Sequence, residues 1–107
     1  MESQCASNGK ASDDVFEKIR SLVQPIALKY PVSGVYLFGS RARGEETSDS
    51  DYDFLVVPKD HMTAFQMCGM LCDLEDQFGD VDLVSSRSIS GEFERNVLSE
   101  RVLIYGE

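Results

Sequence analysis

Cationic side chains are scarce in this sequence. It contains 10 Lys and Arg against 19 Asp and Glu, which gives a formal net charge of −9. Binding to a nucleic-acid backbone takes much of its affinity from Lys and Arg side chains that neutralise phosphates. Arg41 and Arg43 form the one basic pair that stands out. The composition therefore disfavours a long nucleic acid as partner and favours a protein or a small molecule.

Long apolar runs are missing as well. A helix that spans a bilayer needs about 20 predominantly apolar residues, and no run here approaches that length. Residues 1–14 are polar and small, without the apolar centre of a secretory signal. We therefore expect no membrane partner and a cytoplasmic location. We also expect a disordered tail over residues 1–12 and a single folded domain over residues 13–107.

Cysteine and histidine are few. Three cysteines, an odd number without a framework of spacings, fit a reducing compartment rather than a disulfide-stabilised fold. Cys68 and Cys72 lie four residues apart in a helical pattern and could share a metal ion, but a second pair of Cys or His ligands is missing. We interpret them as small residues that face the core.

The chemistry is concentrated between residues 35 and 57. An apolar run over residues 35–38 ends at Gly39, and a charged loop follows. Asp51 and Asp53 then open a second apolar run over residues 54–57. This order predicts a strand, a glycine turn, a loop and a second strand.

Asp51 and Asp53 are two residues apart, so in a strand they would share one face, about 7 Å apart. Adjacent carboxylates repel each other unless a cation lies between them, and hard divalent cations prefer such oxygen ligands. A glycine such as Gly39 lets a phosphate approach the main chain closely. A phosphate-binding turn that faces paired carboxylates is what metal-assisted phosphoryl or nucleotidyl transfer needs.

The spacing of these residues is specific. Gly39 and Ser40 are followed by ten residues and then by Asp51-Tyr52-Asp53. This resembles the signature of the DNA polymerase β-like nucleotidyltransferase superfamily. The fuller signature of its minimal nucleotidyltransferase (MNT) group is Gly-Ser-x-Ala-Arg-Gly, five residues and Ser-Asp-x-Asp. Residues 39–53 match that form at every fixed position, and the resemblance extends over roughly residues 15–105.

Helical and strand patterns alternate along the rest of the chain. Together with the resemblance they predict an α/β fold (α+β), a small mixed β-sheet with helices packed against it. The expected helices cover residues 13–30, 62–78 and 90–98, and the expected strands cover residues 35–38, 54–57, 80–84 and 102–105.

A third carboxylate is expected in the strand over residues 80–84. Asp82 interrupts an apolar run, so its burial would be costly without a partner. A cation shared with Asp51 and Asp53 would offset that cost, and an Asp exposed at a strand edge is the alternative. The resemblance favours a third carboxylate here, because MNT proteins carry one in a short strand after a helix. Asp80 competes for the role, but apolar residues flank Asp82 on both sides.

The resemblance implies a role for each site residue. Asp51 and Asp53 would bind two Mg²⁺ ions, or Mn²⁺, together with the triphosphate of ATP, and Asp82 would complete one metal site and help activate the attacking hydroxyl. Gly39 and Ser40 would bind the β- and γ-phosphates. Arg43, and with less weight Arg41, would hold the Gly-Ser turn or the triphosphate; simple pairing with nearby acids is the alternative.

The resemblance also implies a partner. MNT proteins act as antitoxins of HEPN/MNT toxin–antitoxin pairs and transfer AMP to a tyrosine of the HEPN toxin, which makes a hetero-oligomer the expected assembly. Two alternatives remain open. One is a partner-binding module without catalysis, and the other is a subunit of a small-molecule nucleotidyltransferase of the aminoglycoside-modifying type.

Overall fold

The computed structural model describes residues 11–47 and 50–106. The expected tail therefore lies mostly outside the described residues, and the first helix already begins at Ala11. In chain order the elements are α1 (Ala11–Ala27), β2 (Val32–Phe38), α2 (Ser40–Arg43), β3 (Tyr52–Pro58), α3 (Ala64–Phe78), β4 (Val81–Ser85), α4 (Gly91–Glu100) and β5 (Val102–Gly106).

One mixed sheet carries the fold, with β4, β3, β2 and β5 as its order across the described residues. The strand β2 pairs antiparallel with both β3 and β5, whereas β3 and β4 are parallel and are joined through α3. This is the small mixed sheet that the sequence predicts, and the expected fold class is confirmed.

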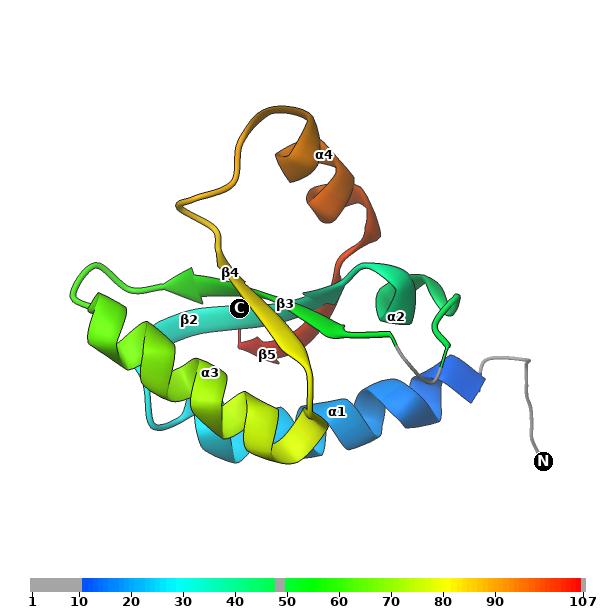
Figure 1. The fold of residues 1–107 in the computed structure, drawn as a ribbon, viewed down its shortest axis with the longest axis horizontal. Helices are drawn as coiled ribbons and strands as arrows, with labels where there is room; N and C mark the ends of the chain where they lie inside the picture. Colours follow the sequence, from blue (N-terminus) through cyan, green and yellow to red (C-terminus); the bar gives the residue numbers. More distant parts are fainter. Residues whose placement is uncertain (1–10, 48–49, 107) are drawn as a thin grey trace.

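Helices cover both faces of the sheet. Figure 1 shows α1 and α3 side by side on one face and α4 on the other. The larger core lies under α1 and α3 and includes Val23, Leu37, Phe54 and Leu74. Since side chains alternate along a strand, the neighbouring residues of β2 and β3 point towards α4. There Tyr36, Phe38 and Leu55 form a smaller core with Ile89 and Val97.

The register of the strands decides which polar residues meet. Asp53 pairs with Phe38 on one side and with Asp82 on the other. Asp53 is also two residues before Leu55, so it lies on the α4 face, beyond the end of the smaller core. The sheet therefore brings the end of β2, the start of β3 and the start of β4 to one edge.

Two local expectations need correction. Cys68 and Cys72 are exposed on α3 rather than turned towards the core. The helix pattern from residue 62 also starts later than expected, because Thr63 caps α3. The Thr63 hydroxyl accepts the amide N–H of Gln66 at 3.1 Å, and the Gln66 side chain accepts the amide N–H of Thr63 at 2.9 Å. This reciprocal pair satisfies two amides that a bare helix end would leave without partners.

Candidate active site

Three carboxylates lie at the α4 side of the sheet edge. Asp53 and Asp82 are direct partners in the parallel pair of β3 and β4. Asp51 immediately precedes β3 and is exposed, as is Asp82, whereas Asp53 is partly buried. Adjacent strands are about 4.8 Å apart, so the two paired backbones hold their carboxylates on neighbouring positions of one face. The register thus brings together the residues that the sequence predicts, and Asp80 lies outside β4.

Negative charge is crowded around Asp53. Partial burial is the largest cause that raises the pKa of its carboxyl group, and Asp82, Asp51 and Glu100 raise it further. The guanidinium of Arg43 acts in the opposite direction. Since the charged form of Asp53 is disfavoured in the folded chain, a cation at this edge would relieve the repulsion.

Gly39 turns the chain directly beside Asp53. Its backbone angles are φ 79° and ψ −159°, in a region that is essentially restricted to glycine. A Cβ atom at this position would clash with Oδ2 of Asp53 and would lie 3.1 Å from its Cγ. Gly39 is therefore required both by the backbone turn and by the close approach of the Asp53 carboxylate.

Replacing Gly39 by alanine should destabilise the chain more than replacing Gly44. Both glycines have positive φ, but a Cβ at Gly44 would meet no described atom within 4 Å. For Gly44→Ala we expect a cost of roughly 1–2 kcal/mol from the left-handed backbone alone. For Gly39→Ala we expect a larger loss together with displacement of Asp53. Urea unfolding of both variants measures this, and equal midpoints would contradict it.

The turn continues into α2, a single helical turn. Ser40 is its first residue, and the amide N–H groups of Ala42 and Arg43 bond back to the carbonyl oxygen of Gly39 at 3.1 Å. Arg41 ties this turn to the loop before Asp51. Its Nη2 and Nε donate to the carbonyl oxygen of Ser50 at 2.8 and 3.2 Å, and its guanidinium carbon lies 3.9 Å from the centre of the Tyr52 ring. Arg41 is therefore a structural link between the turn and the carboxylates.

Sequence reasoning misses one carboxylate of this site, Glu100. Its Oε2 accepts the amide N–H of Gly39 at 2.8 Å, and its Oε1 accepts Nη1 of Arg43 at 2.7 Å. Arg43 also donates from Nε to Glu45 at 2.9 Å. The sequence has no motif around Glu100, which is 61 residues from Gly39. The pairing of Leu37 with Val102 is what brings the two residues together.

The donor set fits a hard divalent cation, because it consists of carboxylate oxygens with too little compensating positive charge. Within residues 11–47 and 50–106, however, no three Cys, His, Asp or Glu side chains converge on one ion position. The carboxylates are thus neighbours along one edge and are not closed around a single point.

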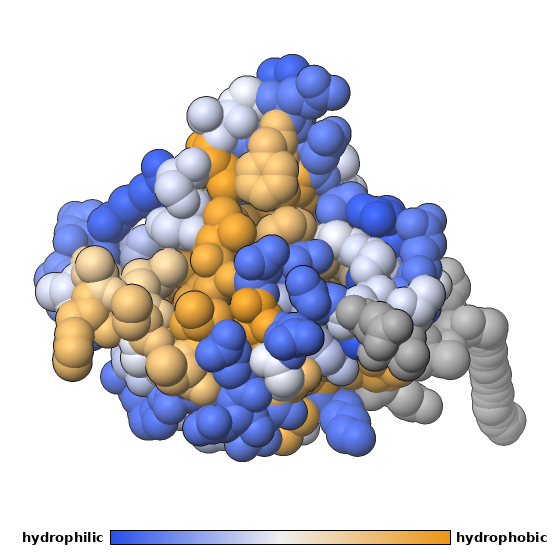
Figure 2. Space-filling model, viewed as in Figure 1, coloured by the Kyte–Doolittle hydropathy of each residue, from blue (hydrophilic) through white to orange (hydrophobic). Residues whose placement is uncertain are grey.

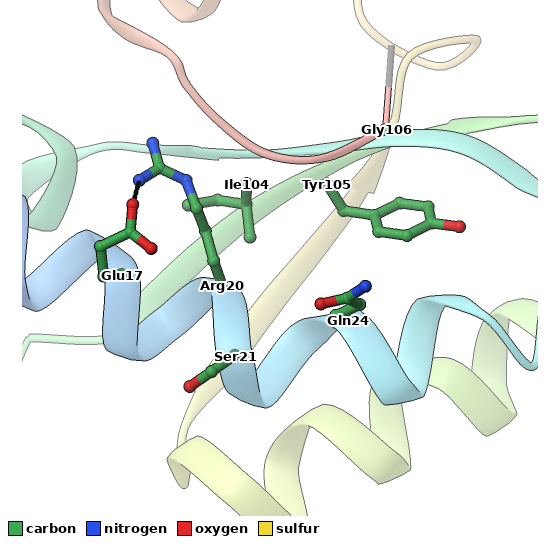
Figure 3. Close-up of a pocket in the computed structure, with 7 residues that line it drawn as sticks. All are labelled: Glu17, Arg20, Ser21, Gln24, Ile104, Tyr105 and Gly106. Carbon is green, nitrogen blue, oxygen red and sulfur yellow. Dashed lines mark hydrogen bonds and ion pairs between the residues drawn. The ribbon is translucent and has the colours of Figure 1, made fainter.

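A cavity in the described part of the chain lies away from these carboxylates. It has a volume of about 410 Å³ and lies between α1 and β5 (Figure 3). Its charged residues are already paired, since Arg20 contacts Glu17 at 2.8 Å and donates from Nε to the carbonyl oxygen of Leu103 at 3.1 Å. It contains none of Asp51, Asp53 and Asp82. This cavity therefore offers no alternative site for the same chemistry.

The chain matches a known protein family over most of its length. The family model described as "Polymerase beta, Nucleotidyltransferase" matches residues 17–107. A protein of Methanocaldococcus jannaschii, "Putative protein adenylyltransferase MJ0435", is 31% identical over 86 residues. That match covers 79% of this chain and 92% of the relative.

Solved structures share the fold. One, "Structure of putative minimal nucleotidyltransferase", is 30% identical with a TM-score of 0.69, and the match covers 84% of this chain and 92% of that chain. Another, "Crystal structure of the toxin-antitoxin with AMP-PNP", is 27% identical with a TM-score of 0.67 and covers 86% of this chain and 73% of that chain.

Proposed function

The chain belongs to the polymerase beta nucleotidyltransferase family and has the minimal nucleotidyltransferase fold, and on this basis we propose that it transfers AMP from ATP to a hydroxyl group of a partner protein. The observation that supports this most is the strand register. It pairs Asp53 with Asp82 on one side and sets Asp53 beside the Gly39 turn on the other. Asp51 lies two residues before Asp53 in the sequence. The register thus brings Gly39, Asp53 and Asp82 to one end of the sheet.

In this proposal the three carboxylates act together. Asp51, Asp53 and Asp82 would hold two Mg²⁺ ions, or Mn²⁺ in their place. When bound, the ions supply positive charge that neutralises the triphosphate and polarises the phosphate under attack. Asp82, exposed on the edge strand β4, accepts the proton of the attacking hydroxyl.

The Gly-Ser turn positions the nucleotide. Ser40, at the start of α2, offers its hydroxyl to the β- and γ-phosphates, and Gly39 leaves the space that the Asp53 carboxylate occupies. The hydroxyl oxygen of the acceptor protein attacks the α-phosphorus of ATP. The bond between that phosphorus and the oxygen that bridges to the β-phosphate then breaks. AMP becomes esterified to the acceptor and pyrophosphate leaves. Arg43, paired with Glu45 and Glu100, supports the turn.

The acceptor is proposed from the resemblance and from the solved neighbours. The toxin–antitoxin structure with AMP-PNP shares this fold at 27% identity. We propose that the partner here is a HEPN-type protein bound in a hetero-oligomer. The described surface provides apolar contact area, since Phe65 is 88% exposed and Phe93 is 49% exposed. Figure 2 shows apolar surface near the beginning of α3 and beside α4.

Within the described residues, no helix is both long and apolar enough to cross a membrane.

Co-expression tests the partnership. The chain is expressed with the product of the adjacent gene and purified through a tag on either protein. We expect a stable complex in size-exclusion chromatography, with both chains in a fixed ratio. Recovery of the free chain alone, while the second protein is present and soluble, would contradict the proposed partner. Phe65→Ser tests the apolar contact area, because it removes the most exposed large apolar side chain from α3 and leaves the carboxylates intact; less complex should then be recovered.

A further inference from the structure

The carboxylate of Glu100 joins three elements at the site. Glu100 is the last residue of α4, and its side chain is 21% exposed. One oxygen accepts the amide N–H of Gly39 at 2.8 Å, at the end of β2. The other accepts Nη1 of Arg43 at 2.7 Å, at the end of α2. A single side chain therefore holds both ends of the Gly-Ser turn.

The turn needs such support. α2 has four residues, all of them described, and none is buried. A helix of one turn is not stable by itself, and tertiary packing usually provides what is missing. Hydrogen bonds to an ionised carboxylate are about twice as strong as neutral ones, so Glu100 can provide this support.

We propose that Glu100 is a positioning residue that sets the Gly-Ser turn against Asp53, and that α4 thereby controls the nucleotide-binding geometry. This inference rests on the proposed nucleotidyl transfer. The proposal also changes the role of the Gly39 amide, because its N–H donates to the Glu100 carboxylate and thereby helps to hold the turn. The phosphates are then left to Ser40 and to the surface of the turn. In this role Glu100 acts through Gly39 and Arg43.

Three variants test the proposal. Glu100→Ala removes both hydrogen bonds, whereas Glu100→Gln keeps an oxygen that can accept the Gly39 amide and removes the charge. Glu92→Ala is the control, because it removes the same charge from the exposed first turn of α4. Two quantities are measured on the full chain: the hydrogen exchange rate of the Gly39 amide by NMR, and the KM for ATP with Mg²⁺ in the presence of the partner.

For Glu100→Ala we expect exchange of the Gly39 amide to accelerate at least tenfold, while amides of the buried residues Val35 and Leu37 keep their rates. The KM for ATP should rise by roughly 10- to 100-fold, the size expected for losing a charged hydrogen bond, with a smaller change in kcat. Glu100→Gln keeps one acceptor for the Gly39 amide but loses the charge and the bond to Arg43, so both quantities should lie between those of the unaltered chain and Glu100→Ala. Glu92→Ala should resemble the unaltered chain.

Two results would overturn the proposal. Unchanged Gly39 exchange in Glu100→Ala would show that the carboxylate does not fix the turn. A lower KM in Glu100→Ala would show that the carboxylate competes with the phosphates instead of positioning their site. If the unaltered chain transfers no AMP, the proposed function fails, but the exchange measurement still decides whether Glu100 holds the turn. The two failures are therefore distinguishable.

Discussion

Asp51→Asn/Asp53→Asn should abolish AMP transfer while the fold persists. The double variant keeps the size of both side chains and removes the carboxylate pair that is proposed to bind the metal ions. Removing even one preorganised electrostatic group typically costs about 10²–10³-fold in rate, so the loss here should exceed roughly 10³-fold. Metal-dependent ATP binding should disappear in the same variant, measured by calorimetry with and without Mg²⁺. Unchanged metal-dependent binding would contradict the assignment.

The same double variant should be more stable than the unaltered chain in a metal-free buffer. Folding raises the pKa of the Asp53 carboxyl, so protonated Asp53 favours the fold and that contribution is lost as the pH rises through the folded pKa. At neutral pH the ionised group is therefore a burden, mainly because it is partly buried and faces Asp82, Asp51 and Glu100. We expect a gain of roughly 0.5–2 kcal/mol, the usual range for relief of unfavourable surface charge.

A charge-matched control separates these effects from the change in net charge. Glu75→Gln/Asp76→Asn removes two exposed neighbouring acids from α3, on the sheet face opposite the carboxylates. It should leave ATP binding and transfer as they are. A loss of activity in this control equal to that of Asp51→Asn/Asp53→Asn would mean that overall charge, rather than the sheet edge, governs binding.

Asp82→Asn should reduce the chemical step more than nucleotide binding. Asp82 faces Asp53 across β3 and β4, and its interaction is proposed to grow as the hydroxyl loses its proton. General-base assistance is typically worth roughly 10²–10⁴-fold in rate, so kcat should fall within that range while the affinity for ATP changes little. Single-turnover kinetics with a preformed chain–partner complex measure this directly.

Asp80→Asn is the control for Asp82→Asn. Asp80 lies two residues earlier, is exposed and precedes β4. It should keep nearly full activity. Native transfer by Asp82→Asn would make Asp82 a surface residue of an edge strand. Loss of transfer in Asp80→Asn together with native activity in Asp82→Asn would assign the third carboxylate to Asp80.

Local patterns predict the centre of the site because its residues are close in sequence. Asp51 and Asp53 share a face by strand geometry, and Gly39 follows an apolar run that can be recognised as a strand. The approach of Asp53 to Gly39 depends in addition on the pairing of β3 with β2, which sets Asp53 beside Phe38. The roles of Asp51, Asp53, Asp82, Gly39, Ser40 and Arg43 stay predictions until the variants are measured.

Long-range pairing is what local patterns do not reveal. Glu100 reaches Gly39 only because β5 pairs with β2 and sets Val102 beside Leu37. On the sequence alone it is one more acid at a helix end. The exposure of Cys68 and Cys72 has a similar origin, because the face that α3 buries is chosen by its contact with the sheet and α1. Met70 and Leu74 are the α3 residues that this contact buries completely.

The intact mass of the partner protein tests the central claim most directly. The purified chain and its partner are incubated with ATP and Mg²⁺, with ATP and a chelator, and with Mg²⁺ alone. The account predicts that the partner gains the mass of one or more AMP units only in the first mixture, and that Asp51→Asn/Asp53→Asn prevents the gain. A partner that keeps its mass in all three mixtures, yet is neutralised by the chain, would contradict transfer and make the chain a binding module.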